Sequence, residues 1–418
     1  MILNRKLMSL ALAGTLLAGA LAGCSALPKG GDKDGGDATP GVTAPTATPG
    51  GTAAVRPTGV PEDVTMEVMG IPGGTALMTV DGTPVDAEEV LYWLSYSADQ
   101  FNQYGMLDWT MDMDGVTMGD YLLNNAVETA KLHAVVRNHA ADAGIALTSE
   151  DDAEFQAQLD QLKTSMAAQL GGEGDQAYQW WLGYIGLTDE SFRRVNEISY
   201  LVRHLQDGLY GEKGTEVPTA EEYLDWAETN GVYRAKHILV KAADTTEESM
   251  AAALETANTI RADLKANGDT EAYFDTVMAE KSEDPGSQSQ PDGYIFGSGD
   301  MVTEFYDGTK ALAEGEISEP VKSSYGYHII LRLPIDPAAQ AAKDKYATLQ
   351  MEATVDQWVA DAKVERTADY DKLDPENDYG KLTEVRADIM KAMQAALAPQ
   401  ETAPVESGTP APTETPAG

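Results

Sequence analysis

Cysteine, histidine and basic side chains are scarce in this chain of 418 residues. Cys24 is the only cysteine, so the chain cannot form an internal disulfide. The 29 lysines and arginines face 68 acidic residues, and the net charge of −39 disfavours binding to nucleic acid or to an anionic membrane surface. Acidic side chains that merely keep the surface hydrated, with no role in binding, would produce the same net charge. There are only five histidines, with no HExxH pattern or cysteine pair, which argues against a zinc site.

The N-terminal residues have the features of an export signal. Two basic residues precede an apolar run, 7–20, that is too short for a comfortable membrane span. The run ends in Leu-Ala-Gly-Cys at 21–24, which resembles a bacterial lipobox. We therefore predict that 1–23 is a lipoprotein signal peptide and that Cys24 is lipidated. An ordinary signal peptide with an incidental cysteine is the alternative.

Two stretches of low complexity flank the rest of the chain. Glycine, threonine, proline and alanine dominate 24–74, and 398–418 is rich in proline and threonine. Neither stretch can bury enough apolar surface to offset the entropy that ordering would cost. We predict a lipid-anchored flexible linker at 24–74 and a disordered tail at 398–418.

Helical patterns dominate 75–231 and return in 335–397. The first region opens with a short strand and an Asp81-Gly82 turn, after which a helix begins near Asp86. Thr148 and Thr219 each have an acidic residue three positions on, as in a capping box. We predict one helical region at 75–231 and a C-terminal helical segment at 335–397, with a break within 372–380.

The pattern changes at Tyr233. An apolar strand, "YRAKHILV", is followed by two helices, a loop rich in Gly, Pro, Ser and Asp, a third helix and a closing strand, "YHIILRL". His237 lies in the first strand and His328 in the last, each on a face with apolar residues. A lone histidine in such a strand is more often a satisfied core residue. Two of them satisfy each other by hydrogen bonding if their strands are neighbours.

Other chemistry at these histidines has little support in the sequence. The stretch "MDMDG" at 111–115 looks like part of a calcium loop, but a first aspartate is missing and Tyr121 stands where the bidentate glutamate belongs. No G-x-S-x-G elbow is present, and Cys24 is used by the anchor, so hydrolysis has no candidate nucleophile. We predict a site that needs neither metal nor cofactor.

Residues 232–334 resemble a parvulin-type peptidyl-prolyl isomerase domain. The motifs that carry the resemblance are, in order, "AKHILV", "SEDPGS", "GYIFGSGDMVTEF" and "LAEGEISEPVKSSYGYHII". The layout of the whole chain resembles the PrsA-type foldase lipoproteins. The resemblance implies an α+β fold: a mostly helical chaperone-like module, in which 75–231 and 335–397 pack together, with an inserted parvulin domain whose small antiparallel sheet is wrapped by helices.

The resemblance also implies roles for individual residues. His237 and His328 align with the paired histidines that organise the parvulin site. Ser323 aligns with a hydroxyl position beside His328, and Asp284 with the position close to the substrate carbonyl. The residues aligned with substrate binding are Phe296, Met301, Phe305 and Tyr294. Taken alone, Asp284 would be a turn former, and the aromatic residues plain core.

Two departures from the family pattern bear on substrate preference. Relatives often have Gly-Gly-Asp-Leu-Gly before the pocket phenylalanine, but this chain has Gln-Pro-Asp-Gly-Tyr at 290–294. Gly293 thus replaces an apolar leucine, and Tyr294 either fills the gap or narrows the pocket. Phospho-specific parvulins have an arginine cluster after the first strand, whereas here Lys241 is followed by acidic residues. We therefore predict no preference for phosphorylated Ser/Thr-Pro.

These features favour a foldase anchored to the extracytoplasmic face of a cell membrane of the Gram-positive type, isomerising Xaa-Pro bonds in exported polypeptides. Its partners would be unfolded or folding polypeptides and, through Cys24, the lipid bilayer. The sequence leaves open whether the chain forms a homodimer. The alternative is a non-enzymatic holdase, in which Trp180, Trp181 and Tyr184 either line an exposed groove or simply pack in the core. A solute-binding lipoprotein is disfavoured, because 85–230 lacks alternating strands and helices.

Overall fold

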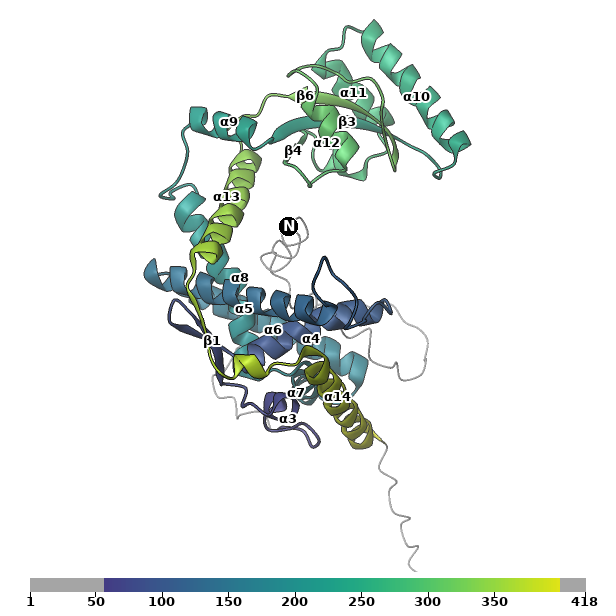
Figure 1. Ribbon diagram of the computed structural model, residues 1–418. Helices are drawn as coiled ribbons and strands as arrows, with labels where there is room; N and C mark the ends of the chain where they lie inside the picture. The colour runs from purple at the N-terminus through teal and green to yellow at the C-terminus, as the bar shows by residue number, and fades with distance from the viewer. Residues whose placement is uncertain (1–55, 399–418) are drawn as a thin grey trace, which may run out of the picture. The chain divides into compact units, whose positions relative to one another are not determined.

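The computed structural model describes residues 56–398, which fall into two compact units (Figure 1). Among the described residues, the helical unit comprises 56–202 and 358–398, and the central unit runs from Arg203 to Gln357. The predicted signal peptide, the Cys24 anchor and most of the predicted linker lie outside the described residues. The predicted tail also lies outside them, from 399 on.

Helices make up most of the helical unit. The first, α3 (Val64–Met69), is short. The longer ones are α4 (Ala87–Gln103), α5 (Met118–Asp142), α6 (Ser149–Leu170), α7 (Gly174–Ile185), most of α8 (Asp189–Tyr210) and α14 (Pro375–Leu397). The predicted capping box at α6 is present, because the Thr148 side chain accepts from the backbone of Asp151 and the Asp151 side chain accepts from that of Thr148. Local sequence signals therefore set the start of this helix.

A small antiparallel sheet accompanies these helices, with strand order β2 (Thr83–Asp86), β1 (Ala76–Val80) and β7 (Val364–Arg366). Asp81 and Gly82 form the predicted turn with positive φ angles of 49° and 87°. The sequence predicts helix throughout 335–397 apart from one break, so β7 is a correction. Three residues have no strand signal of their own, and β7 exists because β1 offers a free edge far away in the sequence.

α3 lies inside the range predicted as flexible linker. The Asp63 carboxylate caps it by accepting from the N–H of Met66 at 2.9 Å and of Gly73 at 2.8 Å. Val68 is buried and packs in one cluster with Leu382 of α14. The ordered part of the chain thus begins before residue 75, because this short helix buries its apolar side against the distant C-terminal helix.

α14 joins the C-terminal segment to the N-terminal helices of its unit. The Arg386 guanidinium donates to the Asp99 carboxylate and to the Tyr184 carbonyl, both at 2.9 Å. Trp180 packs against α14 and is only 1% exposed, and Trp181 is 6% exposed. The alternative in which these tryptophans line an exposed groove is therefore wrong, since both belong to the core.

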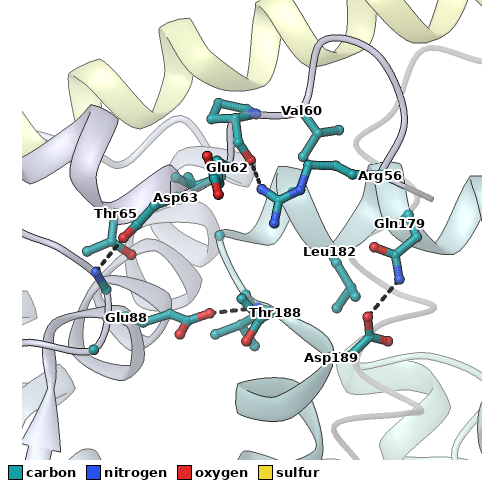
Figure 2. Close-up of a pocket in the computed structure, with 17 residues that line it drawn as sticks. Arg56, Val60, Glu62, Asp63, Thr65, Glu88, Gln179, Leu182, Thr188 and Asp189 are labelled. Atoms are coloured by element: carbon teal, nitrogen blue, oxygen red, sulfur yellow. Dashed lines mark hydrogen bonds between the residues drawn. The ribbon is translucent and has the colours of Figure 1, made fainter. Parts of the chain in front are cut away.

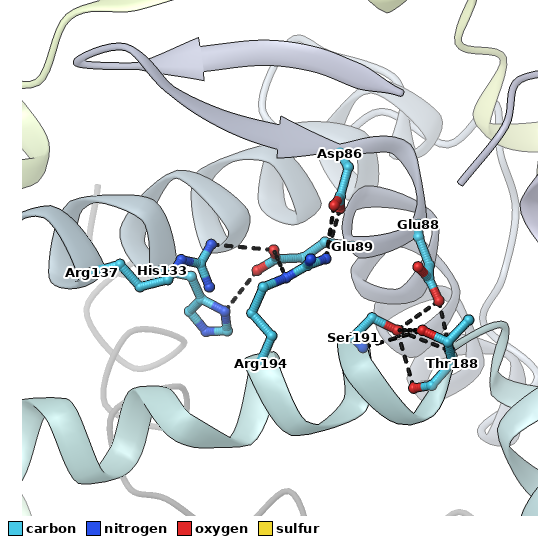
Figure 3. Close-up of polar contacts among 8 residues, drawn as sticks. All are labelled: Asp86, Glu88, Glu89, His133, Arg137, Thr188, Ser191 and Arg194. Atoms are coloured by element: carbon cyan, nitrogen blue, oxygen red, sulfur yellow. Dashed lines mark hydrogen bonds and ion pairs between the residues drawn. The ribbon is translucent and has the colours of Figure 1, made fainter. Parts of the chain in front are cut away.

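A group of charged side chains around the buried Glu89 and His133 links three helices of this unit (Figure 3). Glu89 of α4 accepts from His133 of α5 at 2.8 Å and from Arg137 at 3.3 Å. Arg194 of α8 donates twice to Asp86, at 3.0 and 2.8 Å. Burial acts to raise the pKa of Glu89, but the hydrogen bond from His133 and the neighbouring positive charges outweigh it, so the pKa is lowered. The charged groups are paired here, as buried charges must be.

The central unit carries a four-stranded antiparallel sheet, with strand order β4 (Tyr294–Phe296), β3 (Tyr233–Lys241), β6 (Gly326–Leu333) and β5 (Val321–Ser323). Its other elements are α9 (Ala220–Thr229), α10 (Glu247–Ala266), α11 (Glu271–Lys281), the 3-10 turn η2 (Pro285–Gln288), α12 (Thr303–Lys310) and most of α13 (Gln340–Asp361). The predicted small sheet wrapped by helices is confirmed. The short strands β4 and β5 extend the predicted pair of strands on both sides.

The two faces of this sheet are covered differently. Ile238 and Ile329 project to one face, where they pack in a large apolar cluster with α10 and α11. Alternation along the strands places Ala235 and Ile330 on the opposite face, beside α12 and its Phe305. His237 and His328 lie at positions of this second face, which therefore holds the candidate site.

Candidate active site

The two strand histidines meet on one face of the central sheet. β3 and β6 pair so that His237 lies opposite Ile330 and His328 lies opposite Leu239, which makes the histidines diagonal neighbours. Their rings are 5.2 Å apart and nearly parallel, and the two Nδ1 atoms are separated by 3.1 Å. The exposed fractions of His237 and His328 are 8% and 4%, so the pair is largely withdrawn from water.

The pair is the centre of a longer hydrogen-bonded series. The Ser323 Oγ lies 2.8 Å from the Nε2 of His328, and the Nε2 of His237 lies 2.9 Å from the Oδ2 of Asp284. An ionised carboxylate only accepts, so His237 donates from Nε2 and accepts at Nδ1. His328 then donates from Nδ1 and accepts the Ser323 hydroxyl hydrogen at Nε2. Every polar atom in the series has a partner when both imidazoles are neutral.

The environment of these groups favours that protonation state. Burial lowers the pKa of His237, although the Asp284 carboxylate opposes the shift. Burial and the neighbouring His237 lower the pKa of His328 to about 4. Burial acts to raise the pKa of Asp284, but hydrogen bonds from His237 and Tyr294 outweigh it and the pKa is lowered. At neutral pH the site therefore combines two neutral imidazoles with one carboxylate.

The loop after α11 carries Asp284 to the edge of β3. The Leu239 N–H donates to the Ser282 Oγ at 3.1 Å, and the Glu283 N–H donates to the Leu239 carbonyl at 2.9 Å. Asp284 then caps the turn η2, and its side chain accepts from the N–H of Gly286. These two hydrogen bonds at Leu239 hold the loop so that the Asp284 carboxylate lies beside His237. No sequence pattern predicted them.

Tyr294 has a polar contact that the sequence did not reveal. Its hydroxyl donates to the Oδ2 of Asp284 at 2.7 Å, and its ring lies 5.8 Å from that of His237. The preceding Gly293 has a φ angle of 90°, and a Cβ at this position would come within 2.8 Å of the Ala235 carbonyl. Glycine is therefore required here, and the side chain that follows it is directed at the carboxylate.

The predicted proline-binding residues form one apolar cluster beside the histidines. Phe296 is completely buried and Phe305 nearly so, with their rings 5.4 Å apart. Met301 and Tyr294 are partly exposed members of this cluster. The Phe305 ring lies 4.9 Å from His237 and 5.4 Å from His328. The structure thus brings all eight predicted site residues of the central unit together, while their roles stay predictions.

The helical unit contains a cavity of about 210 Å³, beside α3, α4 and α7 (Figure 2). Its polar walls are occupied by internal contacts. Glu88 accepts from the Thr188 N–H at 2.6 Å, and Gln179 donates to Asp189 at 2.8 Å. The Arg56 guanidinium donates to the Pro61 carbonyl. None of the predicted isomerase residues lines this cavity.

Within residues 56–398, no group of three or more histidine, cysteine or acidic side chains is arranged to hold a metal ion. None of the helices in the same range is long and apolar enough to cross a membrane.

Comparison with known proteins places this geometry in a family. The family "Rotamase: PPIC-type PPIASE domain" matches residues 237–333. "Foldase protein PrsA" of Geobacillus kaustophilus is 35% identical over 144 residues, which cover 32% of this chain and 46% of that protein. "Foldase protein PrsA" of Halalkalibacterium halodurans is 28% identical over 229 residues, covering 53% and 63%. "Chaperone SurA" of Xylella fastidiosa is 39% identical over 102 residues, covering 24% and 21%.

The chain spans less than two thirds of the length of each of these relatives. The segment that the family model matches carries the histidine pair, the Asp284 loop and most of the apolar cluster. Residues 237–333 are a PPIC-type, or parvulin-type, peptidyl-prolyl isomerase domain, in a chain that is similar to the PrsA foldases.

Proposed function

We propose that this chain is a peptidyl-prolyl isomerase that acts on Xaa-Pro bonds of exported polypeptides as they fold. The observation that carries the proposal is the hydrogen-bonded series from Ser323 through both histidines to Asp284, beside the apolar cluster around Phe305. Isomerisation breaks no covalent bond. The site therefore has to bind the proline and reshape its surroundings, without supplying a nucleophile.

The barrier to rotation arises from amide resonance and amounts to about 18–20 kcal/mol without a catalyst. The transition state is twisted and has lost this resonance, so catalysis requires interactions that favour the twisted form over the planar one. In our proposal Phe296 and Phe305 form the walls that hold the proline ring. Met301 is partly exposed and lies where the ring would enter. A dry apolar contact on the ring leaves the preceding carbonyl free to rotate.

Asp284 supplies the electrostatic part of the proposed mechanism. The planar amide places negative charge on its carbonyl oxygen, and a carboxylate nearby disfavours that charge distribution. The twisted amide has a less polarised carbonyl, so the carboxylate repels its oxygen less. His237 donates to Asp284 as a neutral imidazole, so it orients the carboxylate without adding a compensating positive charge. The Tyr294 hydroxyl donates to the same oxygen.

The activity can be tested with the full chain and a short Xaa-Pro peptide. We expect isomerisation far faster than the uncatalysed reaction, which takes tens to hundreds of seconds at 25 °C. We expect a phosphorylated Ser-Pro peptide to be turned over no faster than the unmodified one. Lys241 is followed by acidic residues, and Glu283 already accepts from its backbone N–H at 2.7 Å. The measurement is exchange NMR on both peptides.

Two results would contradict this proposal. A full chain that leaves the exchange rate unchanged is not an isomerase, whatever its fold. A phosphopeptide turned over faster than its unmodified counterpart would show that the site attracts phosphate, despite the acid around it. A peptide with glutamate before proline is the matched control, because it carries negative charge without the phosphate geometry.

We also propose that the chain is tethered to the outer face of the cell membrane through a lipid on Cys24. The Leu-Ala-Gly-Cys sequence at 21–24, which follows an apolar run, supports this. Labelled palmitate should be incorporated into the wild-type chain and not into Cys24→Ser, which should leave the membrane fraction. A Cys24→Ser chain that stays with the membrane would contradict the anchor.

The predicted domain layout is part of the proposal, except that α3 joins the helical module although it lies in the predicted linker. In it, α3, 75–231 and 335–397 form a chaperone module around an isomerase domain at 232–334, and unfolded polypeptides are the partners of both. The packing of α14 on α3 and α7 supports a module built from both ends of the chain.

A further inference from the structure

The connection between α4 and α5 exposes a high share of the large apolar side chains. Nine such side chains are exposed in the described part of the chain, and four of them lie in this connection. They are Tyr104, Met106, Met111 and Val116, with exposed fractions of 71%, 52%, 38% and 43%. We call residues 104–117 the apolar loop. Figure 1 draws it in dark blue, next to α5.

The apolar loop is held in place by specific contacts. The Met111 N–H donates to the Asp108 carbonyl at 2.9 Å, and the Met118 N–H donates to the Met111 carbonyl at 2.8 Å. The Trp109 ring lies 5.5 Å from Tyr379 of α14, which anchors the loop to the helices. An anchored loop of this kind usually buries its apolar side chains or has polar residues at its exposed positions. This loop instead holds them in water, which is unfavourable unless something covers them.

The charged side chains within the apolar loop and the start of α5 have a single sign. Residues 104–120 contain no lysine or arginine. Four aspartates of this stretch are exposed to solvent, namely Asp108, Asp112, Asp114 and Asp120. Charge complementarity therefore favours a ligand that combines apolar groups with positive charge, because an acidic one would be repelled.

We propose that the apolar loop binds extended polypeptide segments in which apolar side chains alternate with lysine or arginine. Methionine side chains are unbranched and polarizable, so they fit apolar groups of varied shape without a fixed pocket. The interspersed aspartates select the basic members among such segments and hasten their encounter. This surface is separate from the isomerase site, so the proposal does not depend on isomerase activity.

The same charges make the other occupants of an apolar surface less favourable. A second copy of the chain would bring the same aspartates against Asp112 and Asp114. An anionic bilayer would repel the loop and the net charge of −39 alike. A basic unfolded segment meets neither of these repulsions, so it is the occupant that the charges favour.

The apolar part of the proposal is tested by fluorescence anisotropy with the full chain. The probe is a labelled 20-residue peptide in which every leucine is followed by either lysine or serine. It contains no proline, so that it does not engage the isomerase site. The triple variant Tyr104→Ser, Met106→Ser, Met111→Ser should bind this peptide about tenfold more weakly or worse. The matched control changes three exposed apolar residues elsewhere, in Met66→Ser, Val217→Ser, Leu224→Ser, and should bind as the wild type does.

The charged part is tested with aspartates replaced by their amides. Asp112→Asn keeps the side-chain oxygen that accepts from the Gly115 N–H. Asp114→Asn tolerates the positive φ angle of 57° at position 114. The double variant should bind the lysine peptide more weakly and with less dependence on salt. Equal binding of a glutamate version of the peptide by the wild type would overturn the proposed selectivity.

Further outcomes separate the occupants and the two sites. Loss of peptide binding in the control triple variant to the same extent as in the loop variant would overturn the proposal. The proposal would also be overturned if the loop variant bound the peptide normally but no longer bound anionic vesicles. The same holds if the variant bound the peptide normally but no longer formed a dimer that the wild type forms. The loop variant should retain the isomerase rate on a short Xaa-Pro peptide. An inactive isomerase that still binds the proline-free peptide would refute the proposed function alone.

Discussion

Replacing Asp284 with alanine should lower kcat/KM for a short Xaa-Pro peptide about 100-fold, the size typical of losing one preorganised electrostatic group. The carboxylate is the only formal charge in the hydrogen-bonded series, because both histidines are neutral at neutral pH. Its removal also leaves His237 without the acceptor that holds its tautomer. The measurement is exchange NMR or a protease-coupled assay at pH 7.

Asp284→Asn separates charge from hydrogen bonding. The amide oxygen still accepts from His237 and Tyr294, so a variant that is as slow as Asp284→Ala shows that the charge itself accelerates rotation. Asp307→Ala is the matched control, since Asp307 is an exposed aspartate on α12 and should leave the rate unchanged. A loss smaller than about threefold in Asp284→Ala would sink the electrostatic part of the mechanism, because single catalytic groups contribute far more.

Replacing Glu89 with alanine should lower the free energy of unfolding of the helical unit by about 3–5 kcal/mol, as expected when one partner of a buried ion pair is removed. The Glu89 side chain is 1% exposed and accepts from both His133 and Arg137. Among the described residues, the Nη1 of Arg137 already has no hydrogen-bond partner. Without Glu89 the guanidinium would lose its remaining acceptor while staying close to the core (Figure 3).

Urea unfolding followed by tryptophan fluorescence is the appropriate measurement for this variant. The Trp93 ring lies 5.3 Å from His133 and therefore reports on the network directly. Glu128→Ala is the matched control. Glu128 also pairs with a basic residue, Lys131 at 3.7 Å, but its side chain is 53% exposed, so the variant should cost no more than about 1 kcal/mol. Equal effects of the two substitutions would mean that the buried network does not stabilise the unit.

The limits of prediction follow from how far each contact reaches in the sequence. The turn at Asp81-Gly82 and the capping box at Thr148 depend on residues at most three positions apart, and both are present as predicted. Within residues 56–398 the short strand β7 pairs only with β1, which lies far away in the sequence, so no local pattern marks it. α3 falls within the predicted linker for the same reason, because its apolar side is covered by α14.

The candidate site shows the same division. Strand alternation by itself places His237 and His328 on strand faces with apolar residues, and the family resemblance adds Asp284 and Ser323. The contact from Tyr294 to Asp284 could not be foreseen, because it depends on the path that Gly293 takes past the Ala235 carbonyl.

The sequence by itself therefore determined the parts of this protein that depend on periodicity and local capping: its helices, its main strands, and the strand faces that carry the histidines. Tertiary structure alone decided how polar groups far apart in the sequence are paired within the helical unit. Glu89 and His133 are 44 residues apart and Arg194 and Asp86 are 108 apart, so their pairing exists only once the helices have packed. It likewise decided that Trp180 is buried while Met106 is exposed, because burial is a property of the neighbours that a side chain acquires and not of the side chain itself.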